Sequence, residues 1–224
     1  MQGIKVVAFD IDGTLYSNTR FYLKIAFYFL KNIKFFLHFN RVRKILHRTA
    51  PLADFYEYQA RLFAEEVKIP VAEAKEKIQK IAYDGLVPYF KKLRIYPYVE
   101  ETFSDLKAAG YRLAILSDFP PEQKGDIWGL SKYCDLIIGS EASGALKPSK
   151  YPFGTLSLKL EVKPEEILYV GNSIRCDVEG AKNAGMKAAY IMSGFRRIFG
   201  IKVKGADISF KNYRQLKKIV LEYK

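Results

Sequence analysis

The stretch that decides the fold is Val6-Val7-Ala8-Phe9-Asp10-Ile11-Asp12-Gly13-Thr14-Leu15. Its leading apolar run is typical of a strand that is buried on both faces of a parallel sheet. Side chains alternate along an extended chain, so Asp10 and Asp12 point to the same side where this strand ends. Gly13 then permits a sharp turn that a residue with a Cβ would resist. Open α/β sheets bind ligands at the carboxyl ends of their strands, so both aspartates are candidate functional residues.

Apolar runs and helical patterns alternate from residue 97 onward, which predicts a parallel sheet with helices on its faces. The expected strands are 4–9, 111–116, 134–138, 166–170 and 187–191, with a weaker edge strand at 206–210. The expected helices of this part are 99–109, 176–184 and 212–223. Gly110 and Gly185 stand where the first two of these helices end.

Residues 17–95 interrupt this alternation and contain no convincing strand. Their apolar spacing predicts three helices, at 20–47, 52–68 and 71–92, with Pro51 and Pro70 at starts or breaks. The segment therefore looks like a helical insertion between the first strand and the second. Residues 16–18 and 95–97 would be the linkers at its two ends.

Four motifs follow one another in the chain, and together they resemble the signature of the haloacid dehalogenase-like (HAD) hydrolase superfamily. After the opening stretch they are Tyr111–Asp118, Gly144-Ala145-Leu146-Lys147-Pro148 and Ile167–Asp177. The resemblance implies an α/β fold, with a Rossmann-like parallel sheet, helices on both faces and a small α-helical cap. On this basis residues 1–16 and 96–224 form the core, and residues 17–95 form the cap.

The resemblance also implies roles for the first two aspartates. Asp10 would attack phosphorus and form an aspartyl-phosphate. Asp12 would protonate the leaving oxygen and then activate the hydrolytic water. Phosphatases of the family keep this second aspartate whereas its dehalogenases lack it, so phosphoryl transfer is expected here. Without the other motifs, Asp-Gly after an apolar run would more often be a simple turn.

Ser117, Asp118 and Lys147 are the expected phosphate-binding residues by the same resemblance. Standing alone, Ser117 would be read as a helix N-cap or turn residue and Lys147 as a surface lysine. The implied cofactor is Mg²⁺, held by the carboxylate of Asp10, the backbone carbonyl of Asp12, Asn172 and Asp177. Asp177 would approach the metal directly or through water, or else orient Lys147.

Two residues depart from the family's common pattern. Asn172 stands where an aspartate is more usual, and an amide oxygen brings no negative charge to a cation. We therefore expect weaker Mg²⁺ binding or a different metal preference. Asp118 stands where an asparagine is often found.

Composition sets wider limits. The chain has 224 residues, 49% of them hydrophobic, with 37 basic and 24 acidic residues and a net charge of +13. This surplus favours anionic partners but selects none of them, and no zinc-ligand spacing, P-loop or RNA-binding motif accompanies it. Nucleic acid is therefore not an expected partner. The two cysteines form no disulfide framework, and the first residues do not resemble a secretory signal, so a cytoplasmic protein is expected.

The predicted helix 20–47 carries an unusually wide apolar arc. The arc consists of Phe21, Tyr22, Leu23, Ile25, Phe27, Tyr28, Phe29, Leu30, Ile33, Phe35, Phe36, Leu37 and Phe39. A basic stripe of Lys24, Lys31, Lys34, His38 and Arg41 recurs at helical spacing, which argues against a membrane span. We expect the arc to pack the cap's own core, the mouth of the site and, as a homodimer, a second subunit. Contact with a membrane surface is an alternative that we do not favour. His38 and His47 are expected to face solvent.

The sequence thus predicts a Mg²⁺-dependent phosphatase that acts on a small phosphorylated metabolite. One alternative is a phosphoryl-transferring mutase, in which the cap returns the phosphoryl group to the substrate. Another is a non-catalytic protein that uses its basic, aromatic cap to bind a membrane or nucleic acid. The identity of the substrate stays open at this point.

Overall fold

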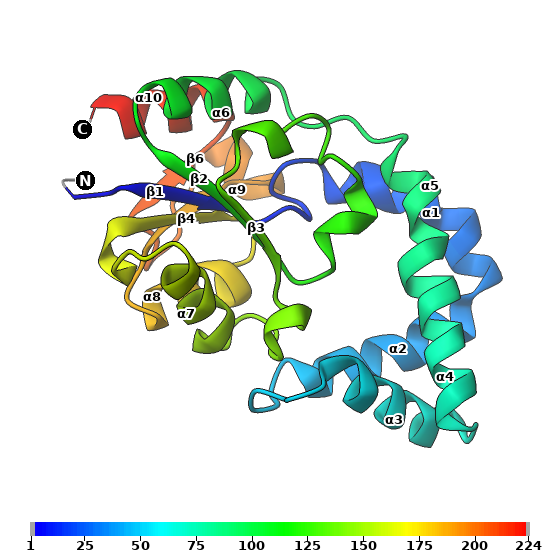
Figure 1. Cartoon of the computed structure of the whole chain (residues 1–224). Coiled ribbons are helices and arrows are strands. Elements are labelled where there is room, and N and C mark those ends of the chain that lie inside the picture. Colours follow the sequence, from blue (N-terminus) through cyan, green and yellow to red (C-terminus); the bar gives the residue numbers. More distant parts are fainter. Residues whose placement is uncertain (1–2, 223–224) are drawn as a thin grey trace.

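The computed structural model describes residues 3–222 and contains one six-stranded parallel sheet (Figure 1). Its strands are β1 (Val6–Phe9), β2 (Arg112–Ser117), β3 (Leu136–Gly139), β4 (Ile167–Gly171), β5 (Lys187–Ile191) and β6 (Ile208–Phe210). Their order is β3-β2-β1-β4-β5-β6, so the first strand lies at the centre. Both of its neighbours are parallel to it, and Ala8 is in register with Ala114 on one side and Tyr169 on the other.

Helices cover both faces of the sheet, as the α/β prediction requires. Val7 and Phe9 pack toward α6 (Val99–Ala108) and α10 (Tyr213–Glu222). Val6 and Ala8 pack on the opposite face toward α7 (Lys150–Lys159) and α8 (Gly180–Asn183). The four residues of β1 are fully buried, which explains their continuous apolar character. A further short helix, α9 (Gly194–Phe199), follows β5.

The turn after β1 requires its glycine. Gly13 has a φ of +85°, a region that L-residues other than glycine seldom adopt. A Cβ at this position would lie 2.2 Å from Nδ2 of Asn172 and 2.4 Å from Nδ2 of Asn18. The turn therefore brings the β1 loop directly against the loop that follows β4.

The helical segment lies beside the carboxyl edge of the sheet (Figure 1). Its helices are α1 (Asn18–Lys31), α2 (Ile33–Leu46), α3 (Phe55–Val67), α4 (Val71–Lys77) and α5 (Val87–Phe90). The chain leaves and re-enters the core at Tyr16 and Ile95, which form an antiparallel bridge. We accordingly propose that residues 17–95 form a cap and that residues 1–16 and 96–224 form the core. The structure describes residues 3–222 of these two parts.

The prediction of one helix over 20–47 was wrong. The structure breaks it at Asn32, whose backbone (φ −113°, ψ 25°) leaves the helical region. The Asn32 side chain donates to the carbonyl of Tyr28, a contact by which asparagine competes with helical backbone bonding. The bend turns Phe29 onto Phe36, with ring centroids 5.1 Å apart.

The segment predicted as one helix over 71–92 is not a continuous α-helix. After α4 the chain passes through a π-helical segment, Ile78–Tyr83, and a 3₁₀ turn, Asp84–Leu86, before α5 begins. In the core, β5 matches the predicted range and the other strands start or end within two residues of theirs. The last residue of the predicted helix 212–223 lies outside the described residues.

No helix within residues 3–222 is long and apolar enough to cross a bilayer.

Candidate active site

Asp10 sits at the end of β1 and is only 4% exposed. Its Oδ1 accepts a hydrogen bond from Nζ of Lys147 at 2.8 Å, and its Oδ2 accepts one from Oγ1 of Thr14 at 2.9 Å. Each carboxylate oxygen of Asp10 therefore has its own hydrogen-bond donor. The carboxylate is fixed in one orientation at the centre of the sheet's carboxyl edge.

Lys147 is buried and lies between two carboxylates. Its Nζ donates to Asp10 at 2.8 Å, to Oδ1 of Asp177 at 2.7 Å and to the hydroxyl of Tyr169 at 3.0 Å. Burial lowers the pKa of Lys147, but the negative charges of Asp10 and Asp177 outweigh it and the net shift is upward. The ammonium therefore stays charged beside Asp10.

The site holds more negative than positive charge around Asp10. Burial raises the pKa of the Asp10 carboxyl to about 7, and Asp177 and Asp12 add to this shift while Lys147 opposes it. A cation next to Asp10 would offset this unfavourable burial. The charge balance of the pocket is therefore suited to a metal ion.

Asp12 lies where the site opens outward. The hydroxyl of Tyr16 donates to its Oδ1, and Nζ of Lys124 lies 3.3 Å from its Oδ2. Ser117, fully buried at the end of β2, places its Oγ 3.4 Å from the same Oδ2. The turn after β1 and the end of β2 therefore bring Asp12 and Ser117 together.

Asp118 is held by its neighbours on the Lys147 loop. Its Oδ1 accepts from the backbone N–H of Lys147 at 3.0 Å. This bond positions the loop that carries Lys147. A carboxylate so placed repels a phosphate group, so any phosphate contact from Asp118 would come from its backbone.

His47 was expected to face solvent, and this expectation was wrong. The residue is half-buried at the end of α2, and its Nδ1 donates to the carbonyl of Lys147 at 2.6 Å. Burial lowers the pKa of its imidazole. His38 lies nearer the surface, where its Nδ1 is 2.9 Å from Oε1 of Glu66.

Two of the four residues expected to hold Mg²⁺ place an oxygen next to the hydroxyl of Thr14. Its hydroxyl is 2.9 Å from Oδ2 of Asp10 and 3.3 Å from Oδ1 of Asn172, so these two ligand candidates converge. Asp177 is turned differently: its Oδ2 accepts from the backbone N–H groups of Asn172 and Ser173, at 3.0 and 2.8 Å. Its Oδ1 accepts from Nζ of Lys147, so both carboxylate oxygens of Asp177 have protein partners. Oxygen donors next to uncompensated negative charge fit a hard divalent cation.

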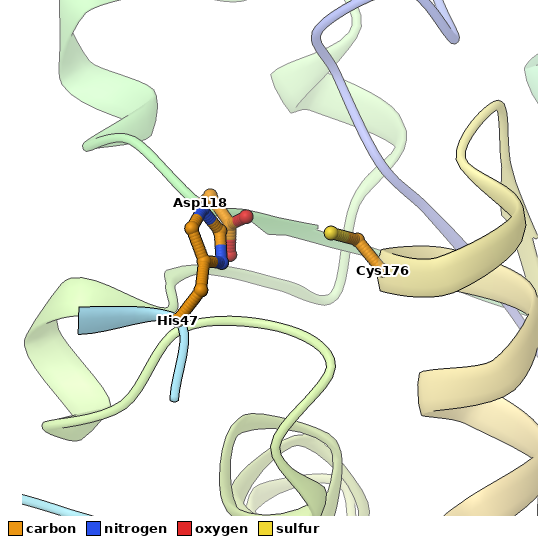
Figure 2. Close-up of side chains that lie close together, drawn as sticks. All are labelled: His47, Asp118 and Cys176. Carbon is orange, nitrogen blue, oxygen red and sulfur yellow. The ribbon is translucent and has the colours of Figure 1, made fainter. Parts of the chain in front are cut away.

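Asp118 also belongs to a second group of potential metal ligands, together with His47 and Cys176. Figure 2 shows His47, Asp118 and Cys176 directed toward one another from α2, the end of β2 and the segment after β4. Within the described part of the chain, one atom from each of these residues lies within 4.8 Å of the other two. Burial raises the pKa of the Cys176 thiol, which keeps the sulfur in its neutral form.

Three contributors to the site were missed in the sequence: Lys124, Tyr16 and Tyr169. Lys124 ends a short 3₁₀ turn, Pro121–Lys124, in a region without periodic patterning. Tyr169 looked like an ordinary strand residue, although its hydroxyl donates to the carbonyl of Leu116 and accepts from Lys147. Tyr16 stands four residues after Asp12, a spacing that only the tight turn converts into contact.

Buried polar contacts fasten the cap to the core. Arg43 of α2 forms an ion pair with Glu141 of the core, and both side chains are almost fully buried. The hydroxyl of Tyr83 donates to Oε2 of Glu141 at 2.9 Å. Gln123 of the core donates to the backbone carbonyls of Ala82 and Tyr83 at 3.0 and 2.7 Å. These contacts hold the cap helices over the carboxyl edge of the sheet.

Curated relatives of the chain are phosphatases of small metabolites. The chain is 29% identical over 203 residues to a glyceraldehyde 3-phosphate phosphatase of Methanothermobacter thermautotrophicus, covering 85% of this chain and 86% of that protein. It is 29% identical over 209 residues to a phosphoglycolate phosphatase of Aquifex aeolicus, covering 87% and 88%.

Solved structures and family models agree with this relationship. A crystal structure of a HAD phosphatase from Thermococcus onnurineus superposes with a TM-score of 0.65 at 25% identity, covering 97% of this chain and 98% of that one. The model of the haloacid dehalogenase-like hydrolases matches residues 4–185, from before β1 to the end of α8. The match includes all four sequence motifs together with the cap, and the chain belongs to the haloacid dehalogenase-like hydrolase family.

Proposed function

We propose that the protein is a divalent-metal-dependent phosphatase that hydrolyses a phosphate monoester through an aspartyl-phosphate on Asp10. The observation that carries the proposal is the placement of the Asp10 carboxylate against Lys147, with Asp12 and Ser117 beside it. The phosphatase names of the two relatives, which cover most of the chain, support the same reaction class.

In the first step, a carboxylate oxygen of Asp10 attacks phosphorus and the bond to the leaving oxygen breaks. Asp12, protonated, gives its proton to that oxygen, so that a neutral alcohol departs. Lys147 stabilises the negative charge on the transferring group. Ser117 is placed to donate its hydroxyl to a phosphoryl oxygen.

In the second step, Asp12 is a carboxylate and takes a proton from water as the water attacks phosphorus. Inorganic phosphate leaves and Asp10 regains its charge. Tyr16 and Lys124 hold the Asp12 side chain toward the leaving group throughout. We assign the metal to Asp10, the backbone carbonyl of Asp12 and Asn172, with Asp177 acting directly, through water or through Lys147. The metal would supply positive charge that offsets the repulsion between the Asp10 carboxylate and the phosphate dianion.

The test is hydrolysis of p-nitrophenyl phosphate by the wild-type protein and by Asp10→Asn. We expect turnover that is lost in EDTA, restored by Mg²⁺ and abolished by Asp10→Asn. Asp105→Asn is the matched control, since Asp105 lies on α6 in a surface ion pair with Lys217. Metal-dependent turnover that survives Asp10→Asn would refute the role of Asp10.

The mutase alternative is separated by following the phosphoryl group. A phosphatase loaded with phosphate on Asp10 releases inorganic phosphate to water, whereas a mutase returns it to an acceptor hydroxyl. Transfer to added alcohols at a rate exceeding hydrolysis would favour the mutase.

A further inference from the structure

The active site opens into a large cavity that is lined mainly by the cap. Its volume is about 710 Å³, within the range of pockets that enclose drug-sized ligands. Asp12 and Tyr16 form its inner end, where the leaving group of the proposed reaction would lie. The cavity is therefore the space available to the organic part of the substrate.

The walls of this cavity are aromatic and aliphatic. Phe21, Phe29, Phe36, Phe39 and Phe90 reach it from the cap, and Phe119 reaches it from the core. Among the described residues that line the cavity, Asp12 carries the only charge. Lys124, the nearby cation, is turned onto Asp12 and is not one of the lining residues.

Such walls do not suit a small acidic substrate. A carboxylate needs a cation or several N–H donors to replace its water, and leaving it without them costs several kcal/mol. Sugar hydroxyls need a comparable set of polar partners. Few uncharged polar residues line the cavity. One of them, Gln123, already uses its amide nitrogen to donate to the backbone carbonyls of Ala82 and Tyr83.

The outer rim of the cavity is also apolar. Leu30 and Tyr22 line it and are nevertheless 63% and 61% exposed, so the cavity reaches the surface along α1. Leu23 and Phe27 continue this apolar surface on the same helix, 74% and 81% exposed. An apolar chain longer than the cavity could leave along this side over Leu23 and Phe27.

We propose that the physiological substrate is a phosphate monoester of a bulky apolar alcohol, of the alkyl, prenyl or aryl type. This inference rests on the proposed phosphatase activity, and it differs from the small polar phosphates named for the two relatives. The phosphate lies at Asp10, the ester oxygen faces Asp12, and the apolar group fills the cavity beneath α1 and α2.

The experiment compares kcat/KM for a series of monoesters in Mg²⁺. The series consists of 2-phosphoglycolate, glyceraldehyde 3-phosphate, n-butyl, n-octyl, geranyl and 1-naphthyl phosphate, each below its critical micelle concentration. Each added methylene that reaches the walls improves kcat/KM by up to about fourfold. We expect octyl to exceed butyl phosphate by at least about tenfold and phosphoglycolate by more. Geranyl and naphthyl phosphate then separate flexible from aromatic substrates.

A matched pair of variants localises the effect to the cavity. Leu30→Ser should lower the ratio of octyl to butyl phosphate turnover, because Leu30 lines the cavity. Leu158→Ser, an exposed leucine on α7 that does not line the cavity, should leave the ratio unchanged. Ala26→Phe, which fills the cavity, should also reduce the ratio. Equal effects of Leu30→Ser and Leu158→Ser, or a preference for phosphoglycolate, would overturn the inference.

Binding of phosphonates separates this inference from the proposed chemistry. Calorimetry measures the affinities of n-butyl- and n-octylphosphonate for the wild-type protein in Mg²⁺, without turnover. Tighter binding of the octyl compound without hydrolysis of any ester would support the cavity's preference and refute the phosphatase. Hydrolysis of p-nitrophenyl phosphate with no dependence on chain length in either assay would support the phosphatase and refute the preference.

Discussion

At the residue scale, Gly13 shows how one backbone position lets the loop after β1 lie against the loop after β4. Its φ of +85° is strained for any L-residue, and a Cβ would also collide with Asn172 and Asn18. Backbone strain of this kind costs about 1–3 kcal/mol. The collision would in addition displace Asn172 from the oxygen cluster around Thr14.

We therefore expect Gly13→Ala to lower stability and to abolish activity. Gly205→Ala is the control, since Gly205 has a φ of +95° with open space around it and would suffer strain alone. Urea unfolding should show a loss of about 1 kcal/mol for Gly205→Ala and a larger loss for Gly13→Ala. Similar unfolding midpoints and full activity in both variants would contradict this account.

Asp12 should act in both steps, and its replacement affects them unequally. p-Nitrophenolate leaves without help from an acid, whereas attack by water still needs a base. Asp12→Asn should therefore reduce turnover by about 10²- to 10⁴-fold and let the phosphorylated protein accumulate. Acid quenching followed by mass spectrometry of the Asp10 peptide measures this. Slow turnover without a phosphorylated Asp10 peptide would assign Asp12 to the first step alone.

The sequence motifs identified four residues that the structure brings close together, although their roles stay predictions. Asp10, Asp12, Ser117 and Lys147 come together because β1 and β2 are neighbours and the Lys147 loop folds over them. Lys124 could not be predicted, since its burial depends on a loop without periodic pattern. The metal assignment and the role of Asp177 remain predictions that a metal-bound structure will test.

At the element scale, the ion pair of Arg43 with Glu141 joins α2 to the core. Removing one partner of a buried pair leaves the other charge without compensation, which costs about 3–5 kcal/mol. We expect Glu141→Gln to destabilise the protein by an amount of this order. Glu100→Gln, in the exposed pair with Lys132, should change stability by less than about 1 kcal/mol. Thermal unfolding of both variants makes the comparison, and equal shifts would contradict it.

Element positions in the core could be predicted better than those in the cap. Strand β5 lies at the predicted 187–191 because a continuous apolar run between turns has few other interpretations. The break at Asn32 could not be predicted, because the apolar and basic spacing continues across it. The alternation of strands and helices predicts a helix between 138 and 166 but not its bounds, since Pro152 and Gly154 fall within α7 and have low helix propensity.

At the scale of the whole molecule, Asp135 makes stability depend on pH. It accepts from Nζ of Lys107 at 2.6 Å and from the backbone N–H of Leu113 at 2.8 Å. Burial raises the pKa of its carboxyl, but these two hydrogen bonds together outweigh burial and the net shift is downward. The carboxyl of Asp135 therefore binds a proton more tightly in the unfolded chain than in the folded protein. Its ionised form stabilises the fold above the ordinary pKa, and this stabilisation is lost as the pH falls through the pKa of the folded protein.

Asp135→Asn should accordingly destabilise the protein near neutral pH and have a much smaller effect in acid. Urea midpoints at about pH 7 and about pH 3 measure the difference between the two proteins. A gap between wild type and variant that is the same at both pH values would show that the charge of Asp135 contributes nothing.

The central position of β1 has a consequence for how the protein is made. Ribosomes synthesise this strand before the other five, yet its two neighbours in the sheet pair with it through the later residues Ala114 and Tyr169. The apolar residues of β1 therefore wait for partners while most of the chain is still being added, and such distant pairing slows folding. The emerging chain must shield this segment by transient collapse or by a chaperone. Asp10 can meet Lys147 and Asp177 only after β4 and the segment that follows it have been made, so a shorter nascent chain cannot assemble the candidate site.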